Sequence, residues 1–312
     1  MVSTESLSQG LPTPIKAVIF DMDGLLLDSE RLYTQVTNEI LAPYNKQLTW
    51  EIKAMLMGRP SEESAKILIE RTGIPLSPEE LLSMLSARQR TLFSTVQPMP
   101  GALKLVQHLH KFNVPIAVSH SLDLSSASYQ AYTDPSRIYM LQKNVDWVLN
   151  QRVFYIIKIA TGSSSVNYDL KSENQSELFS VFQGKVICGD DPDLKRGKPN
   201  PDPFLLAAAR HLGMKLEPDP VTGFLEPPPV DQSGPTTNHL RPDQILVFED
   251  GLAGVEAAKA AGMKVVWVPD PELKNLLTQQ NHQTPHHLKP DQTLTSLLDW
   301  NGQDWALPPF ES

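Results

Sequence analysis

The alternation of short apolar runs with helical segments is the feature that most limits how this 312-residue chain can fold. Each run has the length of a buried strand, and helix-like patterns separate the later ones. The runs lie at residues 17–20, 114–118, 185–188, 244–248 and 264–268, with helices expected at 102–110, 204–211 and 254–261. Strands that alternate with helices form parallel sheets covered on both faces. The sequence therefore predicts an α/β, doubly wound parallel-sheet core.

Residues 29–98 break this alternation, because their apolar residues follow helical spacing alone. Ser61 and Ser77 are each followed by acidic residues, which is typical of the first turn of a helix. We expect a small all-helical cap domain over 29–98, and a core built from 15–28 and 99–312. Residues 1–14 read as a flexible tail, and the proline-rich residues 217–242 read as a surface loop.

Two carboxylates, Asp21 and Asp23, directly follow the first apolar run, and Gly24 comes next. An aspartate can attack phosphorus to form an acyl phosphate. A second carboxylate can protonate the leaving oxygen and later deprotonate a water. A solvated strand end is the alternative interpretation of this pair.

A second acidic pair, Glu249 and Asp250, follows the run at 244–248. The carboxyl ends of parallel strands meet at one edge of a sheet, so Asp21 and Asp250 could share one Mg²⁺ ion. The alternative is that Glu249 or Asp250 caps the next helix. Lys198, before a proline-rich turn, could offset the charge of a nucleophile and a phosphoryl group, or could be a surface lysine.

These motifs in this order resemble the haloacid dehalogenase superfamily, and more closely its pseudouridine-5′-phosphatase branch. The similar segments include 21–30, 57–59, 99–101, 189–192, 197–202, 247–250 and 307–311. The resemblance implies that Asp21 is the nucleophile and Asp23 the general acid and base, with its backbone carbonyl on Mg²⁺. It implies that Asp250 binds the metal, Glu249 supports the metal's waters and Lys198 neutralises charge. Gly58 and Arg59 would reach the substrate from the cap.

The resemblance fails at the strand that should end in a serine or threonine for the phosphoryl group. Residues 114–118 look like this strand but lead into Ser119, whereas 153–160 lead into Thr161. Joining 118 to 160 restores the expected pattern, so we interpret about 119–159 as an insertion, as from an unspliced intron. Thr161 is our choice for the phosphoryl contact, with Ser119 or Ser121 as the alternative.

Composition limits the partners and the compartment. A net charge of −9 argues against a nucleic-acid polymer. The single cysteine, Cys188, suits a reducing compartment, and no apolar run is long enough for a membrane span. We expect a cytoplasmic, monomeric enzyme that acts on a small phosphorylated metabolite, a nucleotide or sugar phosphate such as pseudouridine 5′-phosphate. A sugar phosphomutase, or a protein whose catalysis the insertion impairs, are the alternatives.

Overall fold

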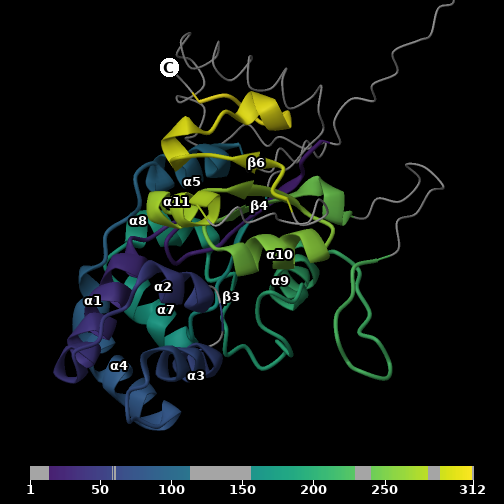
Figure 1. Cartoon of the computed structure of the whole chain (residues 1–312). Coiled ribbons are helices and arrows are strands. Elements are labelled where there is room, and N and C mark those ends of the chain that lie inside the picture. Colours follow the sequence, from purple (N-terminus) through teal and green to yellow (C-terminus); the bar gives the residue numbers. More distant parts are fainter. Residues whose placement is uncertain are drawn as a thin grey trace, which may run out of the picture.

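The strands form one parallel sheet, which confirms the predicted fold class (Figure 1). The computed structural model describes residues 14–57, 59, 61–112, 156–228, 240–279 and 289–310. Within them the strand order is β3-β2-β1-β4-β5-β6. The strands are β1 (Ala17–Phe20), β2 (Ile156–Ala160), β3 (Val186–Ile187), β4 (Ile245–Glu249), β5 (Lys264–Trp267) and β6 (Gln292–Thr293). The central strand β1 lies between β2 and β4, so the residues that follow these three strands meet at one edge.

Of the two segments that compete for the place beside β1, the later one is found there. Strand β2 pairs in parallel with β1 along its whole length, with Ala17 opposite Ile156 and Phe20 opposite Ile159. Thr161 therefore follows the strand next to Asp21. The earlier candidate, 114–118, and most of the proposed insertion 119–159 lie outside the described residues, as do Ser119 and Ser121.

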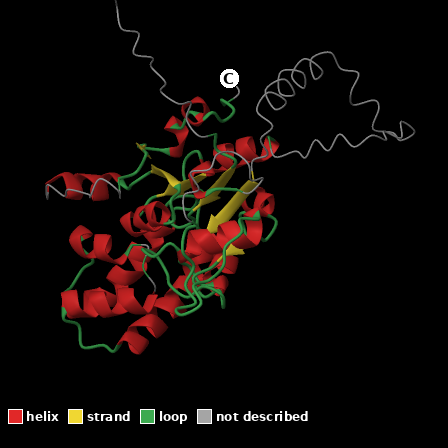
Figure 2. Ribbon diagram, turned by 90° about the vertical axis from the view of Figure 1, so that its right-hand side faces the viewer, coloured by secondary structure: helices red, strands yellow, loops and turns green. Residues whose placement is uncertain are grey.

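Helices cover both faces of the sheet, as Figure 2 shows. Alternate residues of β1 point to opposite faces because side chains alternate along a strand. Val18 and Phe20 pack into the core beneath α5 (Ala102–Lys111) and α8 (Ser176–Phe179). Ala17 and Ile19 pack against α9 (Asp202–Leu212) and α10 (Leu252–Ala260).

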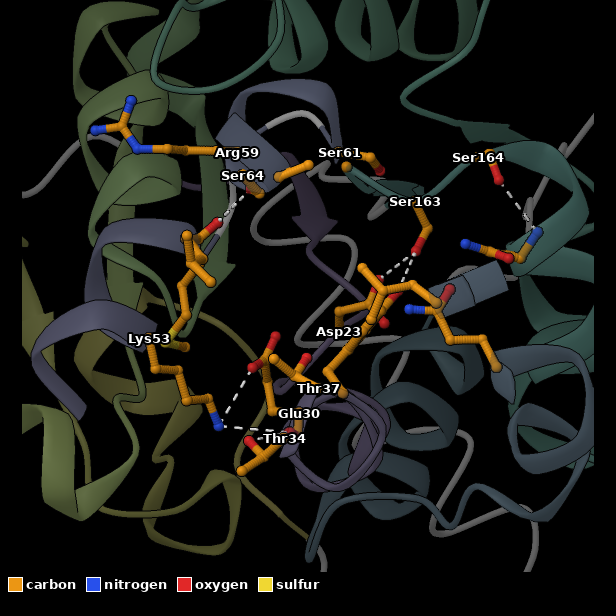
Figure 3. A pocket seen from close by; sticks show the side chains of 18 of the residues that line it. Asp23, Glu30, Thr34, Thr37, Lys53, Arg59, Ser61, Ser64, Ser163 and Ser164 are labelled. Atoms are coloured by element: carbon orange, nitrogen blue, oxygen red, sulfur yellow. Dashed lines mark hydrogen bonds and ion pairs between the residues drawn. The ribbon is translucent and has the colours of Figure 1, made fainter. Parts of the chain in front are cut away.

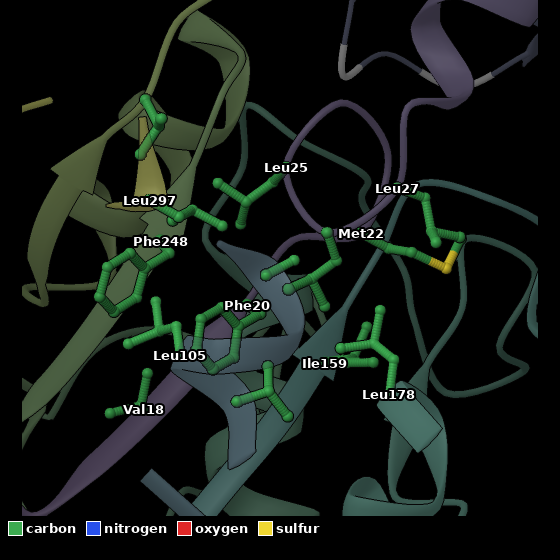
Figure 4. Packing of buried hydrophobic residues seen from close by; sticks show 14 of the residues in the cluster. Val18, Phe20, Met22, Leu25, Leu27, Leu105, Ile159, Leu178, Phe248 and Leu297 are labelled. Carbon is green, nitrogen blue, oxygen red and sulfur yellow. The ribbon is translucent and has the colours of Figure 1, made fainter. Parts of the chain in front are cut away.

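The core on the α5 face is built around stacked aromatic rings. The rings of Phe20 and Phe248 lie 5.0 Å apart between centroids, at 16° to each other. Figure 4 shows them beside Leu105 and Leu297, with Ile159 and Leu178 on the other side of Phe20. This packing fixes the ends of β1 and β4, from which the acidic residues project.

The helical segment expected at 29–98 has a hydrophobic core of its own. Its helices are α1 (Ser29–Leu41), α2 (Trp50–Leu56), α3 (Ser61–Thr72) and α4 (Pro78–Leu92). The predicted start at Ser77 is confirmed: its hydroxyl accepts from the Glu80 backbone N–H, and the Glu80 carboxylate accepts from the Ser77 N–H. The exact division of the chain into core and cap stays a prediction.

Other elements were not predicted. They are α7 (Ser165–Ser172), α8, α11 (Pro271–Gln279) and the two-residue strand β6. Residues 217–228, from the proline-rich loop, form no helix or strand. Among the residues with described positions, no helix has both the length and the apolar character to cross a bilayer.

Candidate active site

A buried lysine joins the acidic residues that follow β1 and β4. The Lys198 ammonium donates to Asp21 Oδ1 at 2.5 Å and to Glu249 Oε1 at 2.6 Å. All three side chains are buried. The Asp21 backbone N–H donates to the carbonyl of Phe248 at 3.0 Å, which holds the two strand ends in register. The interpretation of Asp21 as a solvated strand end, and of Lys198 as a surface lysine, is therefore wrong.

The second acidic pair does not cap the following helix through its side chains. Gly251 is the N-cap residue of α10. Glu249 instead turns back, and its Oε2 accepts from the Gly251 N–H at 3.0 Å while Oε1 accepts from Lys198. Both oxygens of Glu249 therefore have partners, one of which is the ammonium of Lys198.

Asp21, Glu249 and Asp250 form a compact acidic cluster, with ligand oxygens within 4.8 Å of one another. The pKa of Asp21 is raised to about 7, above all by burial; the Lys198 ammonium opposes this rise, and the nearby carboxylates of Glu249 and Asp23 add to it. Burial, followed by the charges of Glu249 and Asp21, also raises the pKa of Asp250. Three acids with one lysine carry excess negative charge in a buried site. A hard divalent cation such as Mg²⁺, which prefers carboxylate oxygens, fits this donor set.

Gly24 allows the first acidic loop to approach Asp250. Its φ is +78°, and a Cβ at this position would lie 2.2 Å from Asp250 Oδ2. A side chain would therefore be strained by the backbone and would also displace the carboxylate. The sequence feature noted after Asp23 is thus required by a close contact between two strand ends.

The Asp23 carboxylate points away from this acidic cluster and accepts four hydrogen bonds. Oδ1 accepts from the Ser29 hydroxyl at 2.6 Å and from the Lys171 ammonium. Oδ2 accepts from the hydroxyls of Ser163 at 2.7 Å and Thr161 at 3.2 Å. Burial opposes ionisation of Asp23, but the ion pair with Lys171 and these hydrogen bonds outweigh it and lower the pKa.

Lys171 is the residue that the sequence analysis missed. It lies on α7, its side chain is fully buried, and it pairs with an aspartate 148 positions earlier. It also donates to the Ser163 hydroxyl at 2.7 Å and to the Tyr33 hydroxyl at 3.0 Å. The sequence contains no local signal for Lys171, because polar and apolar residues alternate through α7.

A cavity of about 500 Å³ opens from Asp21, Asp23, Lys198 and Asp250 and extends between the cap helices. Figure 3 shows its polar wall, where the Lys53 ammonium pairs with Glu30 at 3.3 Å. Arg59 lines the cavity on the side far from Asp23, and its guanidinium pairs with Glu63. Gly58 lies outside the described residues.

Two buried polar side chains line the cavity without a partner of their own among the described residues. Thr37 on α1 and Gln89 on α4 are only 6% and 7% exposed, and both line the cavity. Within the described part of the chain, neither side chain has a hydrogen-bond partner. Buried polar groups are normally paired, so these two are available to a bound molecule.

Comparison with known families agrees with this geometry. Residues 18–130 and residues 143–262 each match a family model described as haloacid dehalogenase-like hydrolase. A crystal structure of a haloacid dehalogenase family hydrolase from Deinococcus radiodurans, with bound phosphate and sodium, has the same fold. Its TM-score is 0.56 at 21% identity, with 95% of this chain and 99% of that chain covered.

Two curated relatives are similar to this chain over nearly their whole length. The (DL)-glycerol-3-phosphatase 2 of Arabidopsis thaliana is 38% identical over 95% of this chain and 93% of its own. The probable pseudouridine-5′-phosphatase of Drosophila melanogaster is 35% identical over 94% of each chain. The resemblance inferred from the sequence motifs is confirmed, and the chain belongs to the haloacid dehalogenase-like hydrolases.

Proposed function

We propose that this protein is a Mg²⁺-dependent phosphatase that hydrolyses a small phosphomonoester through a phosphorylated Asp21. The observation that carries the proposal is the Lys198 ammonium between Asp21 and Glu249, in the same cluster as Asp250 and in the lining of a cavity of about 500 Å³. A fixed, buried nucleophile beside preorganised positive charge is what phosphoryl transfer requires.

In the first step Asp21 attacks the phosphorus of the substrate. The Asp21 oxygen that does not bind Lys198 forms the new O–P bond, and the bond from phosphorus to the leaving oxygen breaks. The proton for that leaving oxygen comes from Asp23. Its pKa is low in the free protein, but the negative charge of an adjacent phosphate favours the protonated form.

In the second step water releases the phosphate. Asp23, now ionised, removes a proton from a water that attacks the phosphorus of the Asp21 acyl phosphate, and the Asp21 carboxylate leaves. The Thr161 hydroxyl makes the longest of the four hydrogen bonds to Asp23, at 3.2 Å. We assign it to a phosphoryl oxygen when substrate is bound, which leaves room at Asp23 Oδ2 for the reacting oxygen.

Mg²⁺ would be held by the carboxylates of Asp21 and Asp250 and by the backbone carbonyl of Asp23. When bound, it supplies the positive charge that offsets the acidic cluster and the phosphoryl oxygens. Glu249 belongs to the same cluster, and through its contact with Lys198 it keeps that ammonium beside Asp21.

The cavity supports a substrate with more than a three-carbon leaving group. Its volume of about 500 Å³ and the unpaired polar groups of Thr37 and Gln89 suit a sugar or a nucleoside with polar edges. The relatives named above include both a glycerol-phosphate and a probable pseudouridine-phosphate phosphatase. We therefore propose a nucleoside or sugar phosphate, with Arg59 at the cavity wall as a further contact.

Phosphate release from a panel of monoesters tests this function. The panel contains glycerol 3-phosphate, ribose 5-phosphate, uridine 5′-phosphate and pseudouridine 5′-phosphate, each with Mg²⁺ and with chelator. We expect Mg²⁺-dependent release that Asp21→Asn abolishes, with higher kcat/KM for the larger esters. Isomerised sugar phosphate in place of free phosphate would favour the mutase instead.

A further inference from the structure

We propose that Lys171 is a positioning residue, which fixes the Asp23 carboxylate for proton transfer to the leaving group. The proposal rests on the function proposed above, because it concerns how Asp23 performs its step. It starts from an unusual feature: a fully buried ammonium that belongs neither to the acidic cluster nor to the lining of the cavity.

A buried ammonium is costly unless its environment compensates for it. Lys171 has three acceptors for its three protons: Asp23 Oδ1, the Ser163 hydroxyl and the Tyr33 hydroxyl. The faces of two aromatic rings also lie near it, with the Tyr33 centroid at 4.9 Å and the Phe93 centroid at 4.7 Å. The ammonium is therefore held in one position.

Lys171 acts on Asp23 twice. It forms an ion pair with Asp23 Oδ1. It also donates a hydrogen bond to the Ser163 hydroxyl, which orients that hydroxyl to donate to Asp23 Oδ2 at 2.7 Å. Both oxygens of one carboxylate are thus set by one lysine. Because Lys171 does not line the cavity, it cannot reach the substrate and must act through Asp23.

The two acidic residues of the first loop consequently have separate lysines. Lys198 holds the nucleophile Asp21, whereas Lys171 holds Asp23. This arrangement lets Asp23 release the Thr161 hydroxyl to a phosphoryl group without losing its orientation, since three donors remain: Ser29, Ser163 and Lys171. Proton transfer depends steeply on such alignment.

The test separates positioning from general damage by the choice of leaving group. An alkyl phosphate needs its leaving oxygen protonated, whereas the nitrophenolate of p-nitrophenyl phosphate leaves readily without a proton. In Lys171→Met, we expect the first-step rate on glycerol 3-phosphate or ribose 5-phosphate to fall about 100-fold, with KM within about threefold. The first-step burst on p-nitrophenyl phosphate should fall less than about fivefold. Asp23→Asn should show the same pattern.

Two further variants make the result decisive. Lys158→Met removes another buried lysine, on β2, which has no ion pair among the described residues, and should leave both rates unchanged. Ser163→Ala is a smaller change that leaves the ion pair of Lys171 with Asp23 Oδ1 in place and removes the hydroxyl that links Lys171 to Asp23 Oδ2. It should lower the alkyl rate about tenfold more than the nitrophenyl burst.

Equal losses on both leaving groups, in Lys171→Met and in Ser163→Ala, would overturn the positioning role. If Lys171→Met does not fold, Ser163→Ala decides alone by the same ratio. Failure of the proposed function is distinguishable, because the unmodified protein would then release phosphate from none of these esters.

Discussion

The Lys198 ammonium lies 2.5 Å from Asp21 Oδ1 and 2.6 Å from Glu249 Oε1, so the proposed nucleophile is already paired with a buried cation. Removing one partner of a buried ion pair leaves the other uncompensated, at a cost of about 3–5 kcal/mol. The pair therefore links stability to activity at this site.

Lys198→Met should lower kcat at least 100-fold and reduce the free energy of unfolding by about 3 kcal/mol, because Asp21 and Glu249 would be left as unpaired buried acids. Phosphate release and chemical denaturation measure the two effects. Lys195→Met is the matched control, since Lys195 is an exposed lysine in the same loop. An active, equally stable Lys198→Met would contradict the role assigned to this lysine.

Mg²⁺ should stabilise the protein more as the pH rises. The pKa of Asp21 is raised from 3.8 to about 7, and that of Asp250 is raised as well, by burial first. At pH values between 3.8 and about 7, Asp21 binds more protons in the metal-free folded chain than in the unfolded chain, so the stability of the folded chain falls as the pH increases. The metal binds the ionised acids and competes with these protons.

Melting curves with Mg²⁺ and with chelator, at about pH 5.5 and about pH 8, measure this linkage. At about 100 times its Kd the metal adds about 2.7 kcal/mol, and the rise in Tm should be larger at the higher pH. Asp250→Asn should remove most of that rise. A Mg²⁺ effect that is equal at both pH values would show that these acids do not bind the ion.

Gly24→Ala should abolish activity because the added methyl group would collide with Asp250. Gly73 is a matched control, because it has a similar positive φ but no such contact. Gly24 and Gly73 have similar backbones, with φ of +78° and +68°, but a Cβ on Gly73 would meet nothing within 4 Å. Gly73→Ala should therefore cost only about 1–2 kcal/mol of stability and keep kcat. Gly24→Ala should also displace Asp250 and lose most Mg²⁺-dependent turnover. Similar kinetics for the two variants would refute the argument from the close contact.

Gln89→Leu should raise KM for the preferred nucleoside or sugar phosphate about five- to tenfold, with kcat almost unchanged, because one hydrogen bond to a bound leaving group is lost. KM for glycerol 3-phosphate, whose leaving group is much smaller, should not change. Gln107→Leu, an exposed glutamine on α5, serves as the control. If KM in Gln89→Leu equals that of the unmodified protein for every substrate, Gln89 does not contact the substrate.

The sequence was sufficient to predict the acidic residues of the site because each lies at the carboxyl end of a strand. Asp21 and Thr161 follow β1 and β2, while Glu249 ends β4 and Asp250 comes next; topology alone brings such positions together. The choice between the two candidates for the strand beside β1 needed the structure, since both runs have the pattern of a buried strand.

Lys171 could not be predicted in the same way. It lies within a helix, and its contact with Asp23 depends on how α7 packs on the loop after β1. The direction of the Asp23 carboxylate, away from the acidic cluster, is likewise set by side-chain packing that no local pattern records. The strand β6 has only two residues, too few for a periodicity to appear.

The proposed function depends above all on the phosphorylation of Asp21 during turnover. Rapid acid quenching during the reaction with the best substrate, then borohydride reduction and peptide mass spectrometry, measures this directly, because reduction converts an aspartyl phosphate to homoserine. We expect homoserine at position 21, at a level that depends on Mg²⁺ and substrate, and we expect none in an inactive Asp21→Asn variant. Full turnover with unmodified Asp21, or full activity of Asp21→Asn, would contradict it.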